Sequence, residues 1–187
     1  MLKFIFAFSF FAQALLPLKQ IPAITKTFKD VSGKNIEIQT GSEGTLVIFT
    51  SEHCPYDLKL RSYLSGLVEQ AAKGKIKSYF VNSNDPKILE QNNLKTMSKS
   101  WQVLKIEAPY LLDSNGDLAK AFRVERTPTA YLFNGKGHLE YFGKVTRLSQ
   151  NSVDTTSLAK ALQSLSEGKA LSSHETSVIG CKIERKN

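Results

Sequence analysis

The chain has little cysteine, and its two cysteines lie far apart. Among 187 residues only Cys54 and Cys181 occur, and Asp57 stands three positions after the first of them. A Cys-x-x-Cys pair is therefore absent, which excludes thiol exchange within such a motif. Two cysteines still allow one intramolecular disulfide, two free thiols or bonds to other chains.

Several other signals are missing as well. We find no repeat, no low-complexity tract and no nucleic-acid-binding motif. Lys and Arg outnumber Asp and Glu by 25 to 17, but they are scattered, apart from the stretch 182–186. This distribution predicts a solvated cationic surface with no nucleic-acid partner, and leaves open attraction to an anionic membrane surface or an acidic partner.

The N-terminus differs in composition from the rest of the chain. Lys3 is followed by an uncharged run over 4–18, shorter than the roughly twenty residues of a membrane-spanning helix. Together with a site at Ala12-Gln13-Ala14, this run predicts a signal peptide over 1–14 and export to the periplasm or cell envelope. An uncleaved anchor or an N-terminal core helix is the alternative. The remainder divides into a domain over 15–169 and a tail over 170–187 that carries Cys181.

Hydrophobic spacing predicts one α/β domain. A strand–helix–strand half comes first and predicts a right-handed parallel unit. An antiparallel hairpin and a last helix follow, so we expect a central mixed sheet flanked by helices, with an N-terminal β extension. The predicted strands are 35–39, 45–50, 76–81, 129–134 and 138–143, and the predicted helices are 57–72, 87–92, 94–104, 118–122 and 156–166.

Cys54 stands where a hydrophobic strand runs into a helix. Pro55 suits the first helical position, because it has no N–H to lose. The unpaired amides and the positive end of the helix dipole then favour the thiolate, so we expect an acidic and reachable sulfur. Asp57 opposes ionisation of the thiol, unless it is only a first-turn acid favoured by the dipole. His53 acidifies the thiol, binds a soft metal or points away; no other well-spaced ligands occur, so no metal site is expected.

Seven segments occur in an order typical of one family. They are His53-Cys54-Pro55-Tyr56, Val81-Asn82-Ser83-Asn84-Asp85, Pro109-Tyr110-Leu111-Leu112-Asp113, Thr127-Pro128, Leu132-Phe133, Tyr141-Phe142-Gly143-Lys144 and Gly180-Cys181-Lys182-Ile183. Over about 30–183 the chain resembles the peroxiredoxin-like redoxin proteins of the alkyl hydroperoxide reductase and thiol-specific antioxidant (AhpC/TSA) superfamily. The resemblance implies a thioredoxin-like fold and a thiol-dependent oxidoreductase.

The resemblance also suggests roles for particular residues. Cys54 would be the attacking thiolate, and a cis bond between Thr127 and Pro128 would shape the groove beside it. Ser51 matches the Thr or Ser three residues before the cysteine of peroxiredoxins. Arg126 supplies the cation that holds thiolate and peroxide, or is a surface charge. Peroxidase activity stays open, because Val47 replaces the proline that normally opens the peroxidase motif.

Cys181 has three interpretations. It resolves an oxidised Cys54, it forms a permanent structural disulfide, or it never approaches Cys54. The predicted reaction is disulfide exchange with a partner dithiol or disulfide protein, or reduction of a small peroxide, with no bound cofactor. The rival hypothesis is a thioredoxin-fold binding or structural module without turnover.

Overall fold

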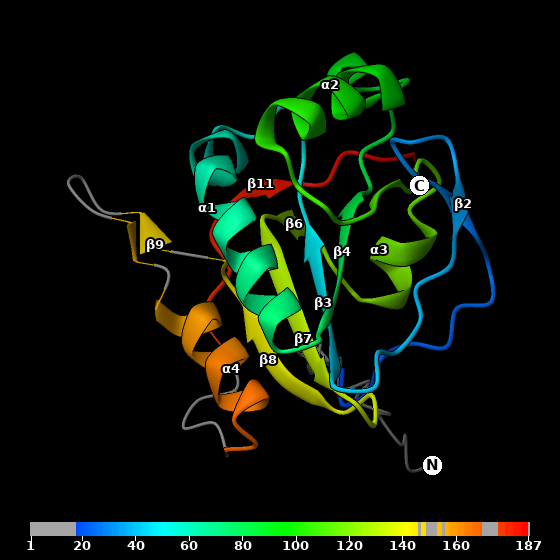
Figure 1. Cartoon of the computed structure of the whole chain (residues 1–187). Coiled ribbons are helices and arrows are strands. Elements are labelled where there is room, and N and C mark those ends of the chain that lie inside the picture. The colour runs from blue at the N-terminus through cyan, green and yellow to red at the C-terminus, as the bar shows by residue number, and fades with distance from the viewer. Residues whose placement is uncertain (1–17, 146, 149–152, 155, 170–175, 187) are drawn as a thin grey trace, which may run out of the picture.

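A five-stranded mixed sheet forms the centre of the computed structural model, in the order β5-β4-β3-β7-β8 (Figure 1). The structure describes residues 18–145, 147–148, 153–154, 156–169 and 176–186. The predicted signal peptide over 1–14 lies outside them. No helix of the described residues is both long enough and apolar enough to cross a membrane.

The elements follow the predicted sequence of strands and helices. In chain order they are β1 (Phe28–Lys29), β2 (Asn35–Ile36), β3 (Gly44–Phe49), α1 (Pro55–Lys73), β4 (Lys77–Asn82), the 3₁₀ helix η1 (Glu90–Asn92), α2 (Leu94–Leu104), β5 (Tyr110–Leu112), α3 (Asp117–Ala121), β6 (Arg126–Thr127), β7 (Thr129–Asn134), β8 (Leu139–Gly143), β9 (Arg147–Leu148), β10 (Val153–Asp154), α4 (Thr156–Ser166) and β11 (Cys181–Lys182). Strands β3, β4 and β5 are parallel to one another, while β7 is antiparallel to both β3 and β8. The predicted parallel unit and hairpin are confirmed.

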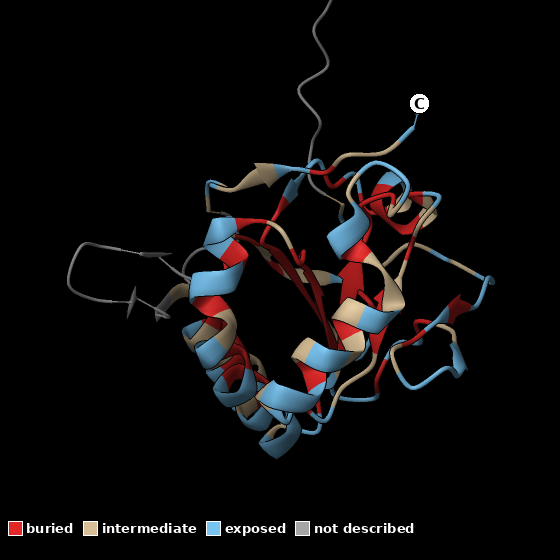
Figure 2. Ribbon diagram, turned by 90° about the horizontal axis from the view of Figure 1, so that it is seen from above, coloured by how far each residue is buried: buried red, intermediate tan, exposed pale blue. Residues whose placement is uncertain are grey.

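Strand β3 is buried on both faces, as its continuous apolar run predicts. Leu46 and Ile48 face one core with α1, α2 and α4, while Val47 and Phe49 face a second core with α3. The alternation follows from the two-residue period of a strand. Figure 2 shows the buried sides of the helices turned toward the sheet. The expected central sheet flanked by helices is therefore confirmed.

Helix α1, which begins directly after Cys54, packs against the first core. Pro55 occupies its first turn, and Gly74 ends it. Leu60, Leu64 and Ala71 form its buried stripe with spacings of a helical period. This packing fixes the N-terminus of α1 at the C-terminal end of β3, where the chain leaves the sheet.

Three predictions from the sequence need correction or extension. Strand β2 ends at Ile36 rather than at residue 39, because Ile38 turns into the second core and the amide of Gln39 donates to the hydroxyl of Tyr79. The predicted helix over 87–92 is reduced to η1. The C-terminal segment also contains an unpredicted strand, β11, which pairs antiparallel with β6.

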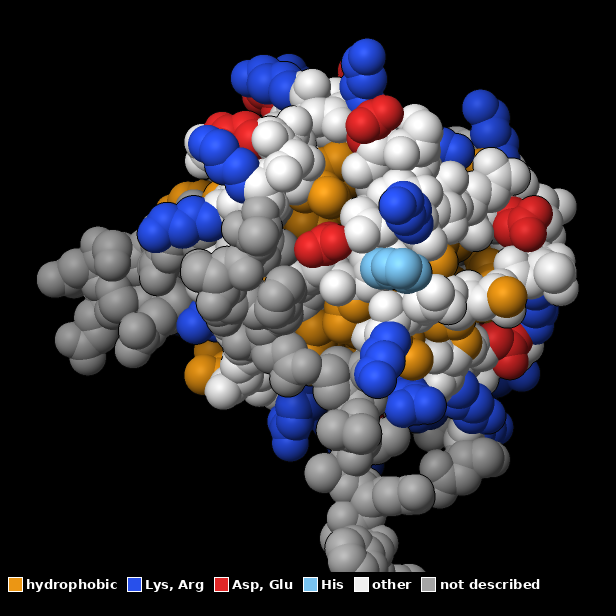
Figure 3. Space-filling view, turned by 90° about the horizontal axis from the view of Figure 1, so that it is seen from below, with side chains coloured by type: hydrophobic (Ala, Val, Ile, Leu, Met, Phe, Trp, Pro, Cys, Tyr) orange, Lys and Arg blue, Asp and Glu red, His pale blue; other side chains and the backbone are white. Residues whose placement is uncertain are grey.

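Lys and Arg side chains are dispersed over the face seen from below, among uncharged and acidic ones (Figure 3). Several of them lie close together along the lower right of this view, and the others stand apart.

Candidate functional site

Cys54 is the N-cap residue of α1, as the sequence predicts. Its backbone is extended, its carbonyl accepts the amide of Leu58 at 3.0 Å, and Pro55 follows at the first helical position. The first-turn amides are therefore directed toward the end of the helix where the sulfur lies, and favour negative charge there.

The peptide bond between Thr127 and Pro128 is cis, which confirms the prediction made from the family resemblance. The Cys54 sulfur lies 3.6 Å from the carbonyl oxygen of Thr127. A reduced thiol can donate to that oxygen, so this carbonyl favours the neutral thiol and opposes the effect of the helix.

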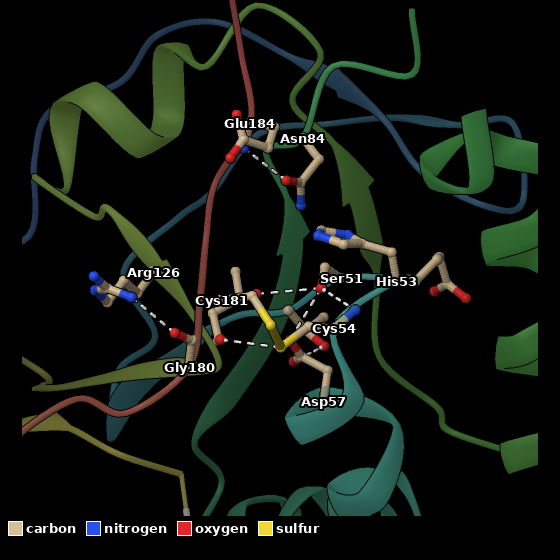
Figure 4. Close-up of a disulfide and its surroundings, with 12 residues drawn as sticks. Ser51, His53, Cys54, Asp57, Asn84, Arg126, Gly180, Cys181 and Glu184 are labelled. Carbon is tan, nitrogen blue, oxygen red and sulfur yellow. Dashed lines mark hydrogen bonds between the residues drawn. A yellow bond between two sulfur atoms is a disulfide. The ribbon is translucent and has the colours of Figure 1, made fainter. Parts of the chain in front are cut away.

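Cys54 and Cys181 form a disulfide (Figure 4). Their Cα atoms are 5.8 Å apart, although 127 positions separate them in the sequence. The pairing of β11 with β6 places Cys181 opposite Thr127, at the residue that precedes the cis proline. The interpretation in which Cys181 never approaches Cys54 is therefore wrong, and the resolving and structural interpretations remain.

The sulfur of Cys54 is less accessible than we expected. Cys54 is 0% exposed, whereas Cys181 is half-buried. Strand β11 lies across the end of α1 and covers Cys54, so the bond to Cys181 itself explains the lost access (Figure 4). The surroundings are polar rather than apolar, because Ser51 and Thr127 line them.

Ser51 connects the cysteine to a buried carboxyl group. Its hydroxyl accepts the amide of Cys54 at 3.3 Å and donates to Oδ2 of Asp57 at 3.0 Å. The hydroxyl of Thr127 also donates to Ser51, at 3.2 Å. Ser51 thus lies beside Cys54, where the sequence placed it.

Asp57 is almost fully buried in the first turn of α1, with 1% exposed. Thr50 donates to its Oδ1 at 2.6 Å. Burial raises the pKa of Asp57 to about 6, against the opposing effect of the hydrogen bonds from Thr50 and Ser51. This carboxyl therefore keeps its proton through mildly acidic pH and becomes an anion near neutrality.

A buried ion pair that was not predicted from the sequence supports the cysteine loop, the segment over 50–54 between β3 and α1. Arg61 on α1 contacts Oε1 of Glu52 at 2.7 Å and donates to the carbonyl of Ser51 at 3.1 Å. Tyr110 and Ser100 also donate to the Glu52 carboxylate, at 3.1 and 2.6 Å. The two residues before His53 are thereby held by α1, α2 and β5.

His53 bonds away from the sulfur. Its Nδ1 lies 3.3 Å from the side-chain amide of Asn92, which also accepts the amide of Glu52 at 2.9 Å. In Figure 4 its ring extends toward Asn84 rather than toward the disulfide. The described residues contain no cluster of three or more His, Cys, Asp or Glu side chains that would hold a metal ion.

Arg126 lies next to the cis proline but is exposed, and its Nη1 donates to the carbonyl of Gly180 at 2.9 Å. It therefore supports the tail strand in this disulfide-bonded state. The charged side chain that contacts the cysteine loop is Arg61 instead.

One sequence signal pointed to the missed part of the site. Asp57 falls on the same helical stripe as Leu60 and Leu64, so its side chain had to enter the core. A carboxyl group there requires polar partners, and the chain offers Thr50 and Ser51 just before the helix. Arg61 gave no comparable signal, because its partner Glu52 lies in a loop whose path depends on the tertiary fold.

A helix-terminal cysteine beside a cis proline, at one end of the central mixed sheet, defines a thioredoxin-like protein, here with its partner cysteine in the tail. A family model described as the AhpC/TSA family matches residues 18–142. The chain therefore belongs to the AhpC/TSA family, as the sequence motifs predicted.

Individual proteins agree with this fold. Sporulation thiol-disulfide oxidoreductase A of Bacillus subtilis (strain 168) is 26% identical over 121 residues, which cover 64% of this chain and 71% of that protein. An uncharacterized conserved protein of Geobacillus kaustophilus has a TM-score of 0.83 at 24% identity, covering 92% of this chain and 94% of its own. A thioredoxin-like protein solved in its oxidized form has a TM-score of 0.61 at 18% identity, covering 81% and 97%. The two structures support the fold alone.

Proposed function

We propose that the chain is an exported thiol–disulfide oxidoreductase in which Cys54 is the nucleophile and Cys181 the resolving cysteine. The observation that carries this proposal is the disulfide between the N-cap of α1 and a tail strand paired beside cis-Pro128. The name of the Bacillus relative, a thiol-disulfide oxidoreductase, supports the same reaction class.

The reaction needs no cofactor. The Cys54 thiolate attacks one sulfur of a partner disulfide, forms a mixed disulfide and releases the other partner sulfur as a thiolate, which takes up a proton. The Cys181 thiolate then attacks the Cys54 sulfur and releases the second partner thiolate. The partner gains two electrons, and Cys54 and Cys181 lose them in forming their disulfide.

Reduction of the internal disulfide by a separate donor dithiol begins at the other sulfur, and the donor's second thiol then releases Cys181 and leaves the donor as a disulfide. In the oxidised state Cys54 is fully buried and Cys181 is half-buried, so an incoming thiolate reaches Cys181 first. Its attack releases Cys54 as a thiolate at the N-terminus of α1, where the helix favours the leaving charge.

Disulfide exchange fits this site better than peroxide reduction. Peroxide reduction calls for a cation that holds thiolate and oxidant. Arg61, which contacts Ser51 beside the cysteine, is already bonded to Glu52, and Arg126 is exposed and donates to Gly180 while the tail is docked.

Export is part of the proposal. Two observations support it. The N-terminal sequence over 1–14 has the pattern of a signal peptide, and a disulfide persists in the oxidising compartment to which export leads. The intact mass of the protein purified from its own cells tests this point, and we expect a mature chain that starts at Leu15.

The activity is tested by incubating the fully reduced protein with a peptide disulfide and following products by non-reducing mass spectrometry. We expect peptide thiols to appear together with the Cys54–Cys181 bond. Cys181→Ser should accumulate a mixed disulfide at Cys54, and Cys54→Ser should be inert. A Cys54–Cys181 bond that resists dithiothreitol in the folded protein would establish a structural disulfide instead. Faster oxidation by hydrogen peroxide than by the peptide would establish a peroxidase.

A further inference from the structure

A docking site for an extended segment lies beside cis-Pro128 and is occupied by the tail. We call it the tail seat. It consists of residues that bond to, or pair with, backbone groups of the tail: Asn84, Asp85, Glu125, Arg126 and Thr127.

Backbone groups of the tail make most of these contacts. The amide of Ile183 donates to the carbonyl of Glu125 at 2.8 Å, and the amide of Asp85 donates to the carbonyl of Glu184 at 2.8 Å. The amide of Glu184 donates to Oδ1 of Asn84 at 2.9 Å. Because backbone groups are common to all residues, these bonds hold an extended segment without selecting its sequence.

Steric contacts in the tail seat select glycine at position 180. A Cβ at this position would lie 1.9 Å from the carbonyl oxygen of Thr127 and 3.1 Å from Cδ of Pro128. The oxygen is a backbone atom, and Cδ is a ring atom bonded to the Pro128 nitrogen, so neither is free to move aside. The tail seat therefore requires glycine immediately before the cysteine.

The side chain of Ile183 is bound in an apolar site. It is 4% exposed and belongs to the second core, whereas Lys182 before it is exposed. The seat thus has an aliphatic slot two residues after the cysteine and no requirement at the residue between them.

Resting on the proposed function, we propose that the tail seat also binds the partner protein. Its ligand is an extended segment with glycine directly before the reactive cysteine and an aliphatic side chain two residues after it. The partner segment occupies the seat while the tail is reduced and detached, which places its cysteine at Cys54. When the Cys181 thiolate forms the internal disulfide, the returning tail takes the same backbone partners and displaces the released thiol.

The test uses the full-length Cys181→Ser protein and peptides whose cysteine carries a nitrothiobenzoate group. Cys54 attacks the peptide sulfur, the mixed disulfide forms, and the coloured nitrothiobenzoate leaves with the electron pair. The three peptides are Ile-Gly-Cys-Lys-Ile-Glu, the same peptide with Ala replacing Gly, and the same peptide with Ser replacing the second Ile. We expect the first to react about tenfold or more faster than either of the others, because each change removes one of the two recognised features.

Competition by the tail gives an independent readout. Adding Ile183→Ser to the Cys181→Ser protein should weaken tail docking and accelerate the parent peptide several-fold, whereas adding the exposed change Lys182→Ser should leave its rate unchanged. Thermal unfolding of each variant shows whether it is folded.

A small aromatic disulfide, Ellman's reagent, separates the two proposals. Equal rates for all three peptides, with a normal reaction toward Ellman's reagent, would overturn the recognition proposal and leave the proposed function standing. A folded protein whose Cys54 is inert toward Ellman's reagent would overturn the proposed function. The Cys54→Ser chain carrying nitrothiobenzoate on Cys181 is the probe for a second copy, and a faster reaction with it than with the parent peptide would overturn the assignment to a partner protein.

Discussion

The hydroxyl of Ser51 joins the carboxyl group of Asp57 to the backbone amide of Cys54, with distances of 3.0 and 3.3 Å. Ser51 and Asp57 are both buried, so water does not screen this connection. The protonation state of Asp57 therefore bears on the stability of the fold and on the reactivity of the sulfur.

Asp57 should make the protein less stable as pH rises from about 4 to about 6. Burial raises its pKa in the folded state from 3.8 to about 6, so over this range the unfolded chain loses its proton first. The free energy of unfolding then falls by on the order of 3 kcal/mol and levels off above the folded pKa. Urea unfolding of the oxidised protein across this pH range measures the fall.

Asp57→Asn isolates that effect. The variant should lack the part of the pH dependence due to this carboxyl, whereas Glu69→Gln, at an exposed position of the same helix, should retain it. Parallel curves for Asp57→Asn and wild type would mean that Asp57 titrates as an ordinary surface acid.

Asp57 should also restrain ionisation of the reduced cysteine. In the Cys181→Ser protein, adding Asp57→Asn removes a buried negative charge near the sulfur. The midpoint of iodoacetamide alkylation should move to lower pH by about half to one unit. The Glu69→Gln change serves as the matched control, and an unmoved midpoint in Asp57→Asn would show that the carboxyl does not affect the thiol.

Substitutions of Arg61 and Glu52, which form a buried ion pair, should have strongly non-additive effects on the free energy of unfolding. Arg61→Met leaves the Glu52 carboxylate buried without its counter-charge, so we expect a loss of about 3 kcal/mol in the free energy of unfolding. Adding Glu52→Gln should restore part of that loss, because the amide is neutral. Urea unfolding of the two single variants and the double variant measures the coupling.

The exposed pair of Lys73 with Glu69 is the control for this cycle. Its side chains are 75% and 71% exposed, so Lys73→Met should cost less than about 1 kcal/mol. Additive losses for Arg61→Met and Glu52→Gln would show that the buried pair acts no differently from a surface pair.

The fold could be predicted from sequence where hydrophobic periodicity and turn residues agree. Helices α2 and α4 and strand β7 coincide with the predicted ranges. Strand β11 could not be predicted, because it consists of two residues whose pairing with β6 depends on the closed tertiary structure. The length of β2 could not be predicted for a similar reason. Ile36 and Ile38 both pack at the second core, as in a strand, but the backbone pairing with β1 stops at Ile36.

Parts of the site could be predicted where neighbouring residues in the sequence determine the local structure. Cys54 before Pro55 implied a helix-terminal sulfur, and the family resemblance supplied the cis form of Pro128. The covering of Cys54 by the tail and the anchoring of the loop by Arg61 are long-range contacts. Neither leaves a periodic trace in the sequence, so both required the structure.

The bond from Cys54 to Cys181 closes a covalent ring that contains most of the domain. A protease that cuts once at any point between the two cysteines therefore leaves two fragments linked as one molecule. The fragments separate only when the bond is reduced, so the redox state of this pair decides whether a single nick amounts to fragmentation.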